Sequence, residues 1–105
     1  MAELSTRVEA ARLAELDRTE GWRAIMGTPS SRRVMWERFE VVGIYRIAHS
    51  LEPGPLAYSE GRRSVALQLM NDLLIYCPEQ YDRMVTENRA RLALEQTTAD
   101  EEGDQ

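Results

Sequence analysis

The side chains best suited to binding chemistry in this sequence are arginines, four of which stand in two adjacent pairs. A guanidinium group can form two parallel hydrogen bonds with a carboxylate or a phosphate, and it can stack on an aromatic ring. These arginines therefore form either an interface for a partner or an internal network of ion pairs, with acids such as Glu37, Glu40 or Glu60. The residues concerned are Arg32, Arg33, Arg46, Glu60, Arg62 and Arg63.

Catalytic chemistry has little support in the sequence. There is one histidine, His49, and one cysteine, Cys77, with no flanking motif that would pair them as base and nucleophile. We expect His49 to be an exposed loop residue and Cys77 a small buried one, as free cysteine usually is. A zinc site needs three or four clustered ligands, and no glycine-rich phosphate loop is present. The sequence predicts no enzyme, no catalytic residue, no metal and no cofactor.

Charge is distributed unevenly along the 105 residues. All 13 basic residues are arginine, and 18 acids give a formal net charge of -5. Residues 28–65 have a balance of +2, whereas residues 66–105 have a balance of -6. A nucleic-acid-binding domain normally carries a basic surface, so the acidic total favours the internal network. The sequence also lacks the run of about 20 apolar residues that a membrane helix requires.

The periodicity predicts an all-α fold, a small bundle of about four helices with a flexible acidic C-terminal tail. Residues 1–18 form an N-terminal helix with a capping box at Thr6 to Glu9 and a thin apolar stripe, which would suit packing on a partner. A short helical turn around Trp22 follows. Thr28-Pro29 is a strong helix start, and Gly43 ends that helix. Further helices run from about residue 55 to 76 and from 78 to 94 or 95.

The expected domain organisation is one helical domain over residues 19–95, with the N-terminal helix before it and a disordered acidic tail over 96–105. Gly61 lies inside the third helix at a cost of about 1 kcal/mol relative to alanine, which suggests close approach by another element. The inward helix faces predict a core of Trp22, Trp36, Phe39, Leu69, Met70, Leu73, Tyr81 and Met84.

Four segments in order resemble a family of tailed-phage proteins. They are GTPSSRRVMW at 27–36, GIYR at 43–46, YSEGRRSVAL at 58–67 and CPEQYDRM at 77–84. Together they are similar to the Bbp-nineteen-like phage domain, a small podophage-type family from structural gene regions, over about residues 22–86. Ser31 and Ala66 stand where that family tends to have glycine, and both are small enough to preserve close packing.

The resemblance implies a virion-associated structural or assembly protein that binds portal, capsid or internal head proteins. It would reside in the virion, and in the host cytoplasm during assembly. No catalytic residues come with the family. A homo-oligomer remains open, whereas no membrane partner is expected. Two alternatives also remain: a small phage nucleic-acid-binding or regulatory protein that uses the arginine pairs, and a host-directed inhibitor.

Overall fold

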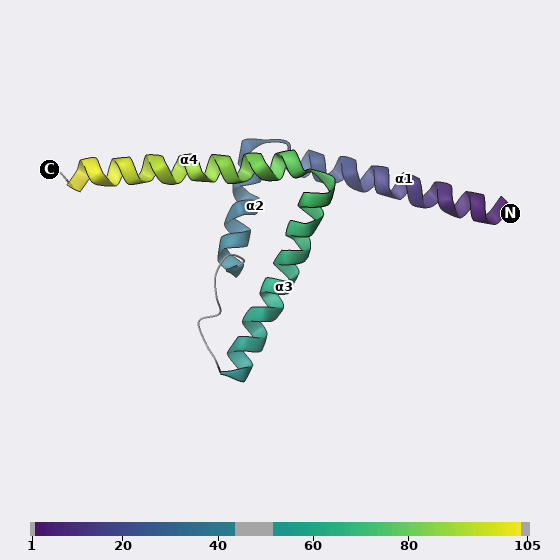
Figure 1. Cartoon of the computed structure of the whole chain (residues 1–105), viewed down its shortest axis with the longest axis horizontal. Helices are drawn as coiled ribbons and strands as arrows, with labels where there is room; N and C mark the ends of the chain where they lie inside the picture. The colour runs from purple at the N-terminus through teal and green to yellow at the C-terminus, as the bar shows by residue number, and fades with distance from the viewer. Residues whose placement is uncertain (1, 44–51, 104–105) are drawn as a thin grey trace.

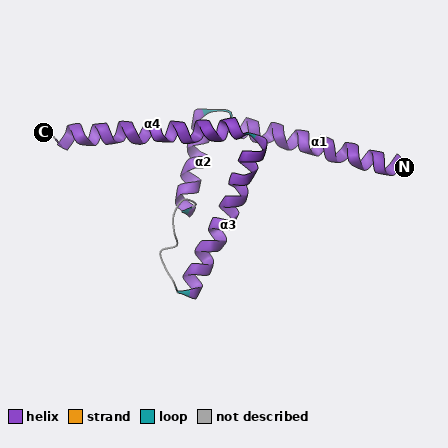
Figure 2. Ribbon diagram, in the orientation of Figure 1, coloured by secondary structure: helices purple, strands orange, loops and turns teal. Residues whose placement is uncertain are grey.

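A computed structural model describes residues 2–43 and 52–103 of the chain. The described residues form α-helices and short turns and contain no strand, so the all-α prediction is confirmed (Figure 2). The four helices are α1 (Ala2–Ile25), α2 (Pro29–Val42), α3 (Pro53–Tyr76) and α4 (Pro78–Gly103). None of the helices in these two ranges combines the length and apolar character needed to cross a bilayer.

The arrangement of the helices is extended. In Figure 1, α1 and α4 leave the centre of the molecule in opposite directions, while α2 and α3 project together to one side. At about 1.5 Å per residue, α1 and α4 are about 36 Å and 39 Å long, and together they account for the longest dimension of 75 Å. The radius of gyration is 19.3 Å, compared with about 13 Å for a compact domain of this size.

A small core lies where the four helices meet. Its buried members come from α2, α3, α4 and the residues that follow α1 and α3: Met26, Phe39, Ala66, Leu73, Cys77 and Met84. A ring of partly buried side chains packs around them: Trp22, Met35, Trp36, Val42, Leu67, Leu69, Met70 and Tyr81. All eight residues of the predicted core therefore lie at the junction, three of them fully buried and five around the edge.

The ends of α2 follow the sequence signals closely. The hydroxyl of Thr28 accepts a hydrogen bond from the backbone N–H of Ser31 at 3.1 Å, and Ser31 closes the capping box from the other side. Pro29 occupies the first turn, where its missing N–H leaves no donor unpaired. Gly43 ends the helix with φ at 69°, a left-handed conformation that favours glycine.

The N-terminal helix differs from the prediction, because α1 continues without a break from Ala2 to Ile25. Thr6, predicted to cap this helix, and Thr19, just before the predicted turn, instead donate their hydroxyl hydrogens to the carbonyls of Ala2 and Glu15, each at 2.9 Å. A threonine inside a helix can bond back in this way. Both act as interior helix residues, so the predicted helix of residues 1–18 and the separate turn around Trp22 are one element.

The C-terminal helix is longer than expected for the same reason. Residues 96–103, predicted to be a disordered tail, lie in α4. Thr97 and Thr98 donate to the carbonyls one turn earlier, at 3.0 Å each, and Gln96 donates to Asp100 at 3.2 Å. The bond between Gln96 and Asp100 supports the helix locally, and the two threonines bond back as interior helix residues do. The division of the chain into a domain over 19–95 with separate ends stays a prediction.

The expectation about Gly61 was wrong. Among the residues that the structure describes, nothing outside its own helix lies within 4 Å of the position that a Cβ would occupy there, so no described element approaches this glycine. The residue is simply a poor helix former in an exposed stretch of α3. That helix also begins at Pro53, slightly before the predicted start.

Candidate functional site

Arg32 is buried at the junction of the helices. The cap at Thr28 fixes the first turn of α2, and this places the Arg32 side chain toward α4. Its Nε and Nη2 atoms donate to the carboxylate of Glu87, at 3.1 Å and 2.7 Å, and its Nη1 donates to the carbonyl of Met26 at 2.9 Å. Arg32 is only 5% exposed. One guanidinium group therefore connects α2, α4 and the turn that follows α1.

The electrostatics of this pair favour the ionised form of the Glu87 carboxylate. The hydrogen bonds from Arg32 hold the pKa of Glu87 below its ordinary value, against an opposing effect of burial. Arg83 and Arg91 add a smaller attraction of the same sign. Because a buried cation without a counterion is costly, Arg32 and Glu87 are best understood as part of the fold.

Arg33, the other member of the first pair, faces outward. Its Nε lies 3.4 Å from an oxygen of Glu37 one turn along α2, and both side chains are about half exposed. An exposed pair of this kind contributes about 0.2–1 kcal/mol. Arg33 also borders a groove between α2 and α4.

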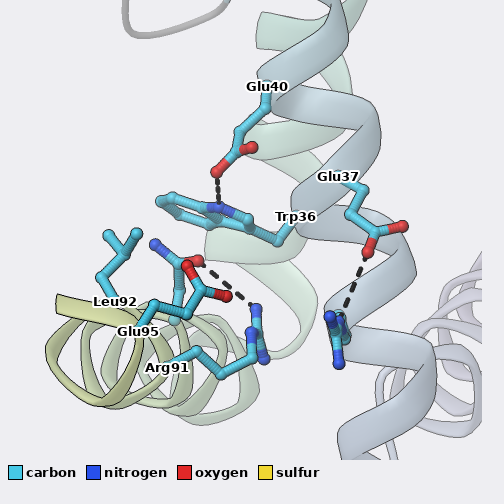
Figure 3. A pocket seen from close by; sticks show the side chains of 8 residues that line it. Trp36, Glu37, Glu40, Arg91, Leu92 and Glu95 are labelled. Atoms are coloured by element: carbon cyan, nitrogen blue, oxygen red, sulfur yellow. Dashed lines mark hydrogen bonds and ion pairs between the residues drawn. The ribbon is translucent and has the colours of Figure 1, made fainter. Parts of the chain in front are cut away.

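The groove has a volume of about 140 Å³. Figure 3 shows the indole of Trp36 facing side chains of α4, with its N–H directed to Glu40. Across from it, Arg91 donates to the buried Asn88 at 3.4 Å. The lining combines an aromatic face, apolar atoms, carboxylates and guanidinium groups: Arg33, Trp36, Glu37, Glu40, Asn88, Arg91, Leu92 and Glu95.

The size and lining of the groove indicate what it can accept. Pockets for small molecules usually have volumes of about 300–1,000 Å³, so this one is small for a metabolite. An aromatic ring beside mixed charges is typical of protein interfaces, where tryptophan, tyrosine and arginine are enriched. The groove is therefore better suited to one side chain of a partner protein than to a free ligand.

The second arginine pair has a different environment. Arg62 donates to the carbonyl of Val41 at 3.5 Å and lies 5.5 Å from the ring centre of Tyr58. A cation near the last carbonyls of α2 complements that end of the helix dipole. Arg63 is half-buried, and Glu60 is exposed and makes no hydrogen bond or ion pair with another described residue.

The six residues singled out in the sequence are thus not gathered in one site. Arg32 and Arg33 lie at the start of α2, whereas Arg62 contacts its end. Arg46 lies outside the described residues, as does His49. Within residues 2–43 and 52–103, no three histidine, cysteine or acidic side chains are grouped as metal ligands would be.

Cys77 lies at the corner between α3 and α4. It is fully buried, and burial raises the pKa of its thiol above the ordinary value. Its backbone N–H donates to Leu73, and its carbonyl accepts from the N–H groups of Gln80 and Tyr81. A thiol that stays protonated and enclosed is a poor nucleophile, so its environment is that of a structural residue.

The partner that sequence reasoning missed is Glu87. We considered nearby acids such as Glu37, Glu40 and Glu60 for the arginines, whereas Glu87 lies 55 positions beyond Arg32. One signal was available. Glu87 follows Met84 by three residues in the fourth helix, which puts it beside the inward face, where an acid requires a buried partner.

The fold and these contacts define a class: an all-α protein with an internal arginine–glutamate connection and an open groove of interface character. The chain belongs to the family of Bbp19-like phage proteins, whose sequence model matches residues 22–86. The predicted resemblance is confirmed, and the protein is a phage-related protein. No curated protein and no solved structure matches the chain.

The family match covers the hydrophobic core of the helix junction. The match begins at Trp22 and ends two residues after Met84, so it contains every residue of the enclosed apolar core. It leaves out most of α1 and all of α4 from Glu87 onward, so the partner of Arg32 and the buried Asn88 lie outside it.

Proposed function

We propose that this protein is a non-enzymatic structural or assembly component of a phage particle. It binds other phage structural proteins, with portal, capsid and internal head proteins as the candidate partners. It acts in the virion, and in the host cytoplasm during assembly. The podophage type implied by the sequence resemblance is part of the same proposal.

One observation carries the proposal: the enclosed core is small, and much of the chain lies on helices that extend away from it (Figure 1). None of the residues of α1 is buried, and large apolar side chains along it are half exposed or more. Helices with exposed apolar stripes find their stability in contacts with other proteins. The groove beside Trp36, between α2 and α4, adds a second surface suited to contact with another protein.

The nucleic-acid alternative has weaker support. Arg32 is enclosed by Glu87, and Arg33 is adjacent to Glu37, so the first pair does not present two unneutralised cations. A salt titration of DNA binding separates the two functions, since each phosphate contact steepens the salt dependence. Absent binding at low salt is the result expected for the structural protein.

Mass spectrometry of purified particles and proheads tests the main proposal directly. We expect the protein in one or both at a stoichiometry well above trace contamination. Its absence from mature particles and from proheads alike would refute the proposal. A pull-down from host lysate separates a host-directed inhibitor, which would retain one host protein in the absence of any phage component.

A further inference from the structure

The chain exposes more surface than a compact monomer of the same mass, as a subunit of an oligomer does before it is assembled. Its accessible surface is 8021 Å², whereas a compact monomer of 12.0 kDa exposes about 6,000 Å². The difference, about 2,000 Å², exceeds the roughly 800 Å² that each partner buries in a standard interface. The surplus is large enough for an obligate contact between two chains.

Large exposed apolar side chains occur on all four helices, and α1 carries the most. On α1 they are Leu4, Val8, Leu13, Leu16 and Ile25. On the outer half of α4 they are Leu92 and Leu94, and Leu94 is 69% exposed. The outer half of each helix has about 12 or 13 residues, and an uncovered helical segment of about that length is only marginally stable in water. Both outer halves would therefore gain from being covered.

The geometry favours a second copy of this chain as the cover. The helices α1 and α4 have nearly equal lengths and extend from the core on opposite sides, close to one line (Figure 1). A two-fold axis perpendicular to that line therefore places α1 of each copy beside α4 of the other. The chain runs toward the core in α1 and away from it in α4, which is the same direction along the line, so the rotation makes each α1–α4 pair antiparallel. The contact is then isologous and closed, as in most homodimers.

Charge complements this arrangement. Residues 95–103 at the end of α4 carry Glu95, Asp100, Glu101 and Glu102 without an arginine, which is unfavourable at the negative end of a helix dipole. Antiparallel packing brings this acidic end to the positive N-terminal end of the other copy's α1. It also brings it close to Arg7, which makes no ion pair or hydrogen bond within the described chain.

We propose that the protein forms a two-fold symmetric dimer in which α1 of each copy packs antiparallel along the outer half of α4 of the other. This goes beyond the proposed function, since self-association and incorporation into a particle are separate properties. A dimer absent from virions would refute only the function, and a monomer found in virions would refute only the dimer.

Sedimentation equilibrium of the full chain at about 1–100 μM tests the dimer. The expected mass is twice 12.0 kDa. Leu94→Glu and Leu13→Glu place a charge in the proposed contact at side chains exposed in one chain, and each is expected to raise the dissociation constant at least tenfold. Val65→Glu, at an equally exposed position on α3, is the matched control and should leave the mass unchanged.

The geometry has a second readout, oxidative cross-linking in the wild-type background, where Cys77 is enclosed. The double variant Leu13→Cys with Leu94→Cys should oxidise to a covalent dimer, because the proposed antiparallel pairing brings the middle of α1 beside the outer half of α4. Leu13→Cys with Val65→Cys should not. A monomer at 100 μM, a larger ring, or cross-linking by the control pair alone would overturn the proposal.

Discussion

The connection between Arg32 and Glu87 permits a quantitative prediction through a double-mutant cycle. The variants are Arg32→Met, Glu87→Gln and the two combined. Each single change removes the charge-assisted hydrogen bonds at 2.7 Å and 3.1 Å, and Glu87→Gln leaves a buried guanidinium group without its counterion. The cycle isolates the interaction between the two side chains from what each change does alone.

The expected coupling follows from burial. Breaking a fully buried ion pair costs about 3–5 kcal/mol. The side chain of Arg32 is 6% exposed, but that of Glu87 is 29% exposed, so water reaches one side of the pair and lowers the cost. We expect a coupling of about 2–4 kcal/mol, a large part of the roughly 5–15 kcal/mol that holds a domain folded.

Urea denaturation followed by circular dichroism at pH 7 measures the free energies of unfolding. Glu87→Gln should lower the urea midpoint by about 1–2 M, given slopes of about 1–3 kcal/mol/M. All variants are compared at one protein concentration, because self-association adds to apparent stability.

A matched control lies next to the pair in the sequence. Arg33 and Glu37 have side chains that are 56% and 49% exposed, and the same cycle with Arg33→Met and Glu37→Gln should give about 0.2–1 kcal/mol. A coupling for Arg32 and Glu87 no larger than that of the control would refute the argument, since it would mean that Arg32 is hydrated.

Three further predictions follow from the described contacts. Because Arg32 holds the pKa of Glu87 below its ordinary value, the pair contributes its stability above the unfolded pKa of about 4.3 and loses it as pH falls further. Acid titration should therefore destabilise the wild type more than Glu87→Gln between about pH 5 and pH 3, and parallel curves would contradict this. Gly61→Ala should raise the free energy of unfolding by about 0.5–1 kcal/mol, since the added methyl group meets open space; a loss in thermal melts would show a close neighbour. Cys77 is fully buried, so a thiol reagent at pH 8 should label it only after unfolding in urea, and rapid labelling of the folded protein would place it at the surface.

Local signals in the sequence were sufficient for most helix boundaries near the core. Thr28-Pro29, Gly43 and Cys77-Pro78 act locally, through side-chain capping and backbone geometry, and the structure has a helix end at each. The expected core residues were also recognisable, because helical periodicity is strong wherever a face is buried. The family resemblance rested on the same region.

The errors were at the exposed ends of the chain. Threonine can cap a helix or bond back inside one, and the sequence around Thr6 and Thr97 does not distinguish these roles when no buried face fixes the helix. The contact of Arg32 with Glu87 was missed for a different reason. Their separation in sequence is large, and only the packing of α2 on α4 brings the two side chains together.

Cys77, the single residue between α3 and α4, affects the direction in which α4 extends from the core. Cys77 joins the two helices at the edge of the core, and α4 extends about 39 Å beyond it. A rotation of about 10° at this corner moves the far end of α4 by about 7 Å, more than the diameter of a side chain. The enclosed residues around Cys77 and Leu73, together with the pair of Arg32 and Glu87, therefore set the direction in which α4 points. A core substitution that left the protein folded but tilted α4 would displace its distant C-terminal end, and an assembling particle would show this as a misplaced contact far from the substitution.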